Sequence, residues 1–407
     1  MDASQTQAPP APPFPWLGLL ILAGAIFVSV TSEFLPTGLL PEMAEGLDVS
    51  QSRIGLLVTI FAGTVVVSAA PLTTLTRRFR RKDLVVVVLI VFALTNFIAA
   101  VAQSYEIVAA SRVLGGLAHG LFWAVVGAYA GHMVPREQLA RAVAVTAAGA
   151  TVAFVLGVPV GTALGHALGW RAAFTTVGVV ILVLTVLVMK FLPRVNHIVE
   201  PKTGEIPVPL RKDPSILGVV LVCAITTVLM SGQNIFYTYI VPFFTTVNGF
   251  DREWVGGLLL IYGLAGAIGL FLVGAVGGRF PRAGLIGGFS LVGIAVLVLG
   301  LFPENRLLAI AALVLWGAAF GGTPALLQTR LLRSASRRLR DVSSAYFTTS
   351  FNVGIGGGAL IGGLLLDAYG LGVLPFVQVG VTVAGIAFVV FSDLILRRRA
   401  TRMAALA

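Results

Sequence analysis

Two residues of opposite charge, Glu33 and Arg112, lie within long apolar runs of the sequence. Glu33 lies about 25 Å from the start of a predicted helix at residue 16. Arg112 lies about 7.5 Å from the start of another, which enters the membrane from the opposite side at residue 107. In a bilayer about 30 Å thick the two residues are therefore at a similar depth. Burial favours the neutral form of a carboxyl group, whereas a nearby guanidinium favours the ionised form. The pair predicts either a carboxyl that takes up and releases protons beside a fixed cation, or a static ion pair that joins two helices.

His119 and Trp123 follow Arg112 at spacings that place all three on one face of a helix. A histidine titrates near neutral pH, and a tryptophan ring stacks on a bound ligand. Two plainer interpretations stay open: that His119 donates a hydrogen bond to a neighbouring carbonyl, and that Trp123 only packs. We predict Glu33, Arg112 and His119 as the proton-coupling residues.

The seventh apolar run is unusually polar toward its end, where amide, hydroxyl and phenol side chains follow one another. Such groups inside a cavity offer hydrogen-bond donors and acceptors to a neutral or weakly polar solute. Hydrogen bonds between helices are the competing explanation for each residue taken singly. The predicted substrate-binding set, which adds amides from later runs, is Trp123, Asn234, Tyr237, Thr238, Gln328 and Asn352.

The composition requires a membrane to hold these residues. Of the 407 residues, 57% are hydrophobic and 11% are charged, against about 25% charged in soluble proteins, and the mean hydropathy is +0.97. Because backbone N–H and C=O groups must be paired in lipid, the spans must be helices or the strands of a closed barrel. The runs are continuously apolar and do not alternate apolar with polar residues, so helices are predicted. The twelve predicted spans are 16–38, 54–76, 84–102, 107–133, 142–168, 172–192, 216–247, 254–278, 284–302, 307–332, 342–366 and 373–396.

Lysine and arginine are distributed very unevenly between the two sets of loops. One set with its helix ends holds 23 of them and the alternate set holds four. Because basic loops stay in the cytoplasm, this predicts a multi-pass protein of the cytoplasmic membrane with both termini inside. The net charge of +11 is then a signal of topology, and no nucleic-acid partner is expected.

The sequence contains little that could serve other chemistry. Its single cysteine, Cys223, excludes a disulfide framework, and no metal-ligand spacing appears. A phosphate-binding Gly-x-x-x-x-Gly-Lys loop is absent, so ATP is not the expected energy source. No clustered catalytic set lies near an interface, so we expect neither an enzyme nor a cofactor.

The chain divides into two similar halves. A proline-rich segment over 193–215 is predicted to be a cytoplasmic linker between six-helix bundles at 16–192 and 216–396. Basic loops and glycine pairs recur in both halves at an offset of about 200 residues, which indicates pseudo-symmetric bundles around a cavity. Residues 1–15 are predicted to be a disordered cytoplasmic tail, and 397–407 a second cytoplasmic tail.

Three segments resemble the major facilitator superfamily, and within it the 12-span drug:proton antiporter family and its sugar-efflux-like branch. Residues 31–36 (Thr-Ser-Glu-Phe-Leu-Pro) with 38–41 resemble the first-helix signature of that branch, and 111–116 (Ser-Arg-Val-Leu-Gly-Gly) resemble the fourth-helix arginine motif. Residues 157–162 (Gly-Val-Pro-Val-Gly-Thr) resemble the fifth-helix motif associated with antiporters.

This resemblance implies an all-helical fold of two bundles that rock about a solute near the midplane, with Glu33 and Arg112 exchanging protons. It also implies motif roles for Arg77 and Arg81 after the second span, and for Gly157, Pro159 and Gly161 in the fifth. Thr76 departs from the family pattern, which has an acid at that place, so the charge relay of that loop is in question.

The prediction is therefore a monomeric, proton-coupled antiporter that exports a small organic solute across the bilayer by alternating access. The solute is expected to be a sugar, a nucleoside or a drug-like compound. The alternative is a proton-coupled importer, a symporter, of a sugar or nucleoside.

Overall fold

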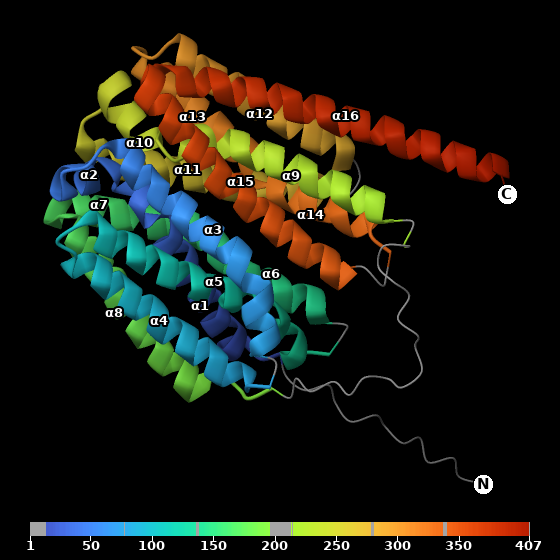
Figure 1. Cartoon of the computed structure of the whole chain (residues 1–407), viewed down its shortest axis with the longest axis horizontal. Helices are drawn as coiled ribbons and strands as arrows, with labels where there is room; N and C mark the ends of the chain where they lie inside the picture. The colour runs from blue at the N-terminus through green and yellow to red at the C-terminus, as the bar shows by residue number, and fades with distance from the viewer. Residues whose placement is uncertain are drawn as a thin grey trace, which may run out of the picture.

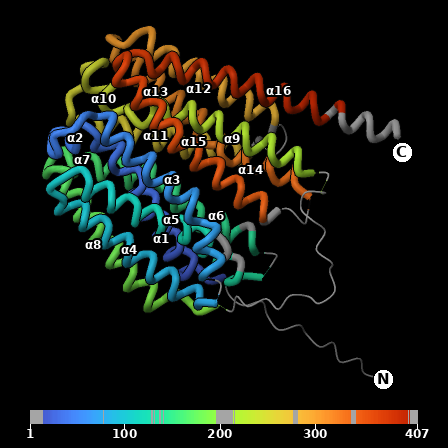
Figure 2. Tube along the Cα trace, in the orientation of Figure 1, coloured from blue at the N-terminus to red at the C-terminus, as the bar shows by residue number. Residues whose placement is uncertain are grey.

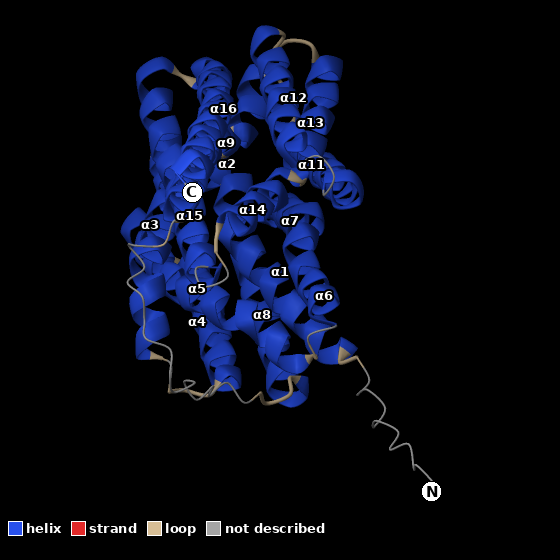
Figure 3. Cartoon of the chain, turned by 90° about the vertical axis from the view of Figure 1, so that its right-hand side faces the viewer, coloured by secondary structure: helices blue, strands red, loops and turns tan. Residues whose placement is uncertain are grey.

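The structure is a computed structural model that describes residues 14–76, 78–135, 138–195, 213, 215–277, 281–336 and 340–406. Within that part of the chain every regular element is a helix, as Figure 3 shows. Twelve helical segments are long and apolar enough to cross a membrane. The predicted fold class is confirmed, and the protein is a multi-pass membrane protein.

The first half of the chain contains six spans and one short helix. Pro159 has no N–H to donate to the carbonyl of Val155, and the fifth span passes through a π-helical segment, η2 (Ala153–Gly157), just before it. The other elements are α1 (Trp16–Gly38), α2 (Leu40–Leu47), α3 (Gln51–Leu75), α4 (Arg81–Val101), α5 (Tyr105–Met133), α6 (Leu139–Val152), α7 (Val158–Leu168) and α8 (Trp170–Phe191).

The second half departs from the sequence prediction in three places. The seventh span is interrupted after Tyr237, the tenth is interrupted at Gly322, and the last helix continues past residue 396. Its elements are α9 (Ile216–Tyr237), α10 (Ile240–Pro242), the π-helical η4 (Phe243–Val247), α11 (Arg252–Leu272), η5 (Val273–Gly277), α12 (Pro281–Leu301), α13 (Arg306–Gly321), α14 (Thr323–Ser334), α15 (Arg340–Tyr369), η6 (Leu371–Val373) and α16 (Leu374–Leu406).

The two halves lie side by side, α1 to α8 in blue to green and α9 to α16 in yellow-green to red (Figure 1). They meet along two helix pairs, α3 with α15 and α11 with α7, and α2 contacts α10 at one end. We call this the α2 end. The opposite end is the one at which α1 and α9 begin, and α16 extends past the bundle there (Figure 2).

Glycines allow the halves to approach closely near the α2 end. A Cβ atom at Gly55 of α3 or Gly363 of α15 would collide with the hydroxyl of Tyr239, which donates to the carbonyl of Ala359 at 2.8 Å. On the other helix pair, a Cβ at Gly263 of α11 would lie 2.4 Å from the carbonyl oxygen of Phe154. These contacts would have to separate if the halves rocked apart at this end.

The motif glycines of the fifth span have a different role. A Cβ at Gly157 would lie 2.0 Å from the hydroxyl of Thr31, and one at Gly161 would lie 2.7 Å from Leu35. Both neighbours belong to α1 of the same half. Gly157 and Gly161 therefore pack the fifth span against α1 and leave the seam between the halves to other glycines.

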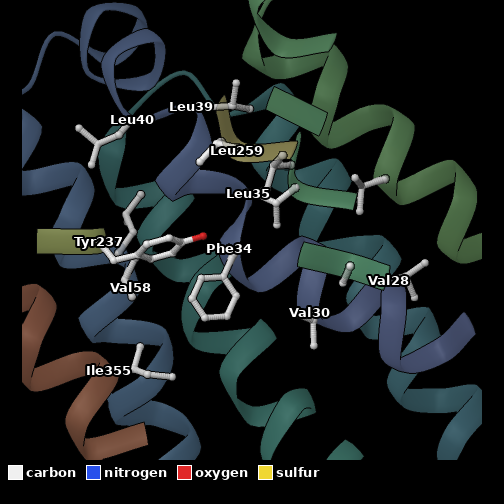
Figure 4. Close-up of a cluster of buried hydrophobic side chains, with 14 of the residues drawn as sticks. Val28, Val30, Phe34, Leu35, Leu39, Leu40, Val58, Tyr237, Leu259 and Ile355 are labelled. Atoms are coloured by element: carbon white, nitrogen blue, oxygen red, sulfur yellow. The ribbon is translucent and has the colours of Figure 1, made fainter. Parts of the chain in front are cut away.

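The buried apolar residues show where the halves are joined. One large cluster contains residues of both halves, among them Phe34 and Leu35 of α1 and Tyr237 of α9. In Figure 4 the hydroxyl of Tyr237 points toward α1. Two smaller clusters, around Leu19 and around Leu331, are each confined to one half near the opposite end. This conformation is closed at the α2 end.

Some predicted features fall outside the residues that the structure describes. Arg77, most of the predicted linker and nearly all of the N-terminal tail are among them.

Candidate functional site

Arg112 of α5 reaches α1 beside Glu33, as the estimate of depth predicts. Its two terminal nitrogens donate to backbone carbonyls, Nη1 to Ser32 at 3.0 Å and Nη2 to Glu33 at 2.8 Å. Both side chains are buried, with Arg112 4% and Glu33 6% exposed. The guanidinium thus holds the backbone of α1 and leaves the carboxyl group of Glu33 to other partners.

Pro36 explains why a carbonyl of α1 needs an outside donor. Proline lies inside α1 and has no N–H, so it removes the helical hydrogen bond to the carbonyl four residues earlier, that of Ser32. A buried carbonyl without a partner costs about 1–3 kcal/mol. Arg112 supplies the missing donor, and the Ser-Glu-Phe-Leu-Pro sequence makes the site that receives it.

The remaining surroundings of the guanidinium fix its plane. Its carbon lies 4.1 Å from the centre of the Phe61 ring, a cation–π contact. Asn96 of α4 donates to the hydroxyl of Ser32 at 2.8 Å. A cavity of about 10 Å³, close to the room that one water needs, is lined by Ser32, Phe61, Asn96 and Arg112 among others. Arg112 Nε and Asn96 Oδ1 have no hydrogen-bond partner among the described residues.

His119 connects the carboxyl group to two other side chains. Its Nδ1 lies 3.0 Å from the hydroxyl of Ser29, and its Nε2 accepts the indole N–H of Trp123 at 2.7 Å. Glu33 Oε2 lies 3.5 Å from the same Nε2. Since Nε2 accepts from Trp123, the hydrogen of the neutral ring is on Nδ1.

This pattern bears on the proton of Glu33. An ionised carboxylate would face the lone pair of Nε2 at 3.5 Å, whereas a protonated carboxyl would face it as a donor. Nε2 could therefore accept from the neutral acid, but only in an arrangement in which Trp123 does not already donate to it. Ionisation would instead favour contact with Arg112, whose guanidinium is held next to the same residue by the Glu33 carbonyl.

A second buried polar cluster, in the other half, is built around Gln233, which belongs to the polar stretch of the seventh span but is missing from the predicted substrate-binding set. Gln233 of α9 donates to the hydroxyl of Tyr262 at 3.1 Å and accepts from the indole of Trp316 at 3.0 Å. Gln378 of α16 donates to the same Gln233 oxygen at 3.3 Å. The rings of Tyr262 and Tyr237 lie 5.2 Å apart. The signal in the sequence was a glutamine among the polar residues of the seventh span.

The structure does not gather the predicted substrate-binding residues into one cluster. Asn234 and Asn352 are buried and donate to carbonyls of their own helices, those of Met230 and Thr348. Gln328 is exposed on α14. Thr238 is buried just after the end of α9, Tyr237 joins the Gln233 cluster, and Trp123 is half-buried beside His119.

The predicted motif residues at the opposite end lie near an ordinary helix junction. Arg81 begins α4, and the neighbouring Lys82 donates to the carbonyl of Met189 in α8 at 2.8 Å. In the other half a single acid, Asp393 of α16, pairs with two arginines, Arg282 and Arg330, both at 2.6 Å. Residues 76–80 contain no acid that could replace the one missing at Thr76. In the second half, the arginines at this end have an acidic partner on the last helix.

Comparison with known proteins identifies the family. The sequence profile described as Major Facilitator Superfamily matches residues 22–359. The chain belongs to the Major Facilitator Superfamily. As a member it is a solute transporter, which agrees with two six-helix halves that share one buried seam.

Relatives and solved structures of the Major Facilitator Superfamily agree with this placement. A probable sugar efflux transporter of Helicobacter pylori is 30% identical over 364 residues, covering 89% of this chain and 92% of that protein. One of Helicobacter acinonychis is 30% identical over 88% of this chain and 90% of that protein.

Two solved structures share the fold. A bacterial homolog of the human lysosomal transporter Spinster, in an inward-facing and occupied conformation, superposes with a TM-score of 0.73 at 16% identity, covering 92% of this chain and 96% of that one. The nucleoside transporter NupG superposes with a TM-score of 0.72 at 14% identity, covering 93% and 100%.

Proposed function

We propose that this transporter exports a small neutral solute in exchange for protons, and that Glu33 carries the proton. The observation that supports it most is the pairing of partners around Glu33. His119 Nε2, at 3.5 Å, would accept from a protonated carboxyl once Trp123 no longer donates to it, and Arg112, which donates to the Glu33 carbonyl, would stabilise an ionised carboxyl. A site with a partner for each form can load and release a proton at little cost.

The proposed orientation follows the distribution of basic residues. If the protein lies in the cytoplasmic membrane with both termini on the cytoplasmic side, the α2 end faces the outside of the cell. The conformation described above would then be closed to the outside. The tails and the linker over 193–215 would then be cytoplasmic, and the bundles at 16–192 and 216–396 would rock as two units. We propose a monomer, since one chain supplies both halves of the site.

The solute class follows from the Gln233 cluster and from the relatives. The cluster offers amides, a phenol and an indole but no charge. Amide groups and aromatic rings suit a solute with many hydroxyl groups and apolar C–H faces. Two relatives are named probable sugar efflux transporters. We therefore propose a sugar or a sugar-like solute.

Neutralising Glu33 tests the proposal. Inside-out membrane vesicles with an acidic lumen are given radiolabelled mono- and disaccharides. The parent is expected to accumulate a sugar as protons leave. Glu33→Gln is expected to lose gradient-driven accumulation at least tenfold, because its side chain cannot release a proton, yet to keep exchange of labelled for unlabelled sugar.

Glu106→Gln is the matched control, since it makes the same change in a 73% exposed side chain of α5. Gradient-driven accumulation by Glu33→Gln equal to that of the parent at every pH would contradict the proposal. Sugar loss from inside-out vesicles under the same gradient would indicate the proton-coupled importer instead.

A further inference from the structure

One atom of the site is approached by two groups. The indole nitrogen of Trp123 lies 2.7 Å from His119 Nε2, and Glu33 Oε2 lies 3.5 Å from that same nitrogen. A neutral imidazole has a single lone pair at Nε2, which accepts one good hydrogen bond. We propose that Trp123 is a positioning residue whose N–H competes with the proton of Glu33 for this lone pair, which makes proton and solute exclude each other.

The surroundings of His119 leave few other groups able to influence this competition. The charged or titratable residues that face it are Glu33 from α1 and Arg112 from two turns earlier on α5. Ser29 occupies its Nδ1 side. From α3 and α4, the rings of Phe61 and Phe92 lie against His119. Nε2 is therefore the one acceptor for which the two donors compete.

The competition acts in the direction that the exchange of solute for protons requires, so this inference rests on the proposed function. With Trp123 on Nε2, the acid proton of Glu33 has no imidazole acceptor, so its O–H bond breaks more readily and the proton leaves to water. The carboxylate left behind is stabilised by Arg112. If Trp123 swings away, Nε2 accepts a hydrogen bond from the protonated carboxyl of Glu33. This hydrogen bond makes Glu33 keep its proton.

The solute would influence this competition by contacting Trp123. Trp123 is half-buried, whereas His119 and Arg112 are buried, so the indole is the member of the group that keeps an accessible surface for a solute to touch. An aromatic face stacks on the C–H face of a sugar. A solute stacked on the indole would hold it in the arrangement seen here and keep the proton off Glu33.

Infrared titration tests this without a transported substrate. The carbonyl stretch of a protonated Glu33 is followed against pH in purified, full-length protein in lipid nanodiscs, and Glu33→Gln identifies the band. Trp123→Phe keeps a ring and removes the competing N–H. Its titration midpoint is expected to rise by about one pH unit, the effect of one hydrogen bond. Trp254→Phe, at a 64% exposed residue, should leave the midpoint unchanged.

A second variant separates this role from simple packing. In a His119→Phe background, Trp123→Phe should no longer move the midpoint, because the acceptor is gone; Trp123→Met replaces Trp123→Phe if the latter does not fold. An unchanged midpoint for Trp123→Phe in the parent, with the Glu33 band present, would overturn this inference and leave the proposed function standing. Absence of any titrating band that Glu33→Gln removes would instead contradict the proposed function.

Discussion

The two halves of the transporter hold buried polar clusters of different chemistry. In the first half, Glu33, Arg112 and His119 include two groups of opposite charge. In the second half, the cluster around Gln233 contains amides, a phenol and an indole, and no charged residue takes part in its hydrogen bonds. Under the proposed function, the first cluster handles the proton, and the second recognises the solute together with Trp123 of the first half.

The two clusters are mechanically connected at the seam. Phe34 follows Glu33 directly in α1, and its ring lies 4.9 Å from that of Phe154. Tyr237 belongs to the second cluster and points toward the same stretch of α1 (Figure 4). A change in α1 at Glu33 would therefore reach residues that pack between the halves, where the proposed rocking would begin.

The largest expected effect comes from removing the cation of the first half. Arg112→Leu leaves the Ser32 carbonyl unpaired, because Pro36 gives it no helical donor, and should lower the free energy of unfolding by about 2 kcal/mol. Adding Pro36→Ala supplies a backbone N–H and should recover about 1 kcal/mol. Thermal unfolding in detergent measures both, and gradient-driven transport should stay lost in the double variant.

Pro36→Ala alone is the control for this pair. If it stabilises the parent as much as it stabilises Arg112→Leu, the two residues do not act on one carbonyl. The first cluster would then be an ion pair whose backbone contacts are incidental.

A smaller effect is expected from the uncharged cluster. Gln233→Leu removes the acceptor of Trp316 and Gln378 and, under the proposed function, one hydrogen-bonding group for the sugar, so it should weaken sugar binding by about 10-fold, the effect of one lost hydrogen bond. The infrared midpoint of Glu33 should not move, because no proton is handled in that half. A shift of that midpoint by Gln233→Leu would show that the halves do not divide the tasks.

The sequence predicted the spans and the meeting of Glu33 with Arg112, because hydropathy and helical rise fix depth. It could not show that the guanidinium binds carbonyls of α1, since that depends on how α5 packs against the turn of α1 that precedes Pro36. Gln233 was seen as one polar residue among several of the seventh span. Its role as a hub needs Trp316 and Gln378, which lie 83 and 145 residues away.

The breaks in the seventh and tenth spans show the same limit. Tyr237 and Gly322 each lie inside a single predicted span, because hydropathy counts a broken helix and a straight one alike. Each break lies shortly before a proline, Pro242 or Pro324, which has no backbone N–H to donate, and in the tenth span Gly322 also approaches Val273 closely. A single sequence contains no local signal for such contacts.

The smallest expected effect tests the closed α2 end, where the halves are joined by an exposed ion pair. Arg252 of α11 donates to Glu45 of α2, and this hydrogen bond holds the pKa of Glu45 below its ordinary value. Because the side chains are 51% and 63% exposed, the pair should contribute only about 0.2–1 kcal/mol. Glu45→Gln should therefore shift the closed population by less than about fivefold.

The sign of the pH dependence follows from the lowered pKa. The contribution is complete above the unfolded value of about 4.3 and is lost as pH falls through the folded-state pKa, so mild external acid leaves the bridge intact. Spin-label distances between α2 and α11 measure the population, and high salt should reduce the difference. Glu106→Gln breaks an equally exposed contact with Arg53 inside one half. If it opened the α2 end as much as Glu45→Gln, the effect would come from surface charge, and the bridge between the halves would have no specific part in closure.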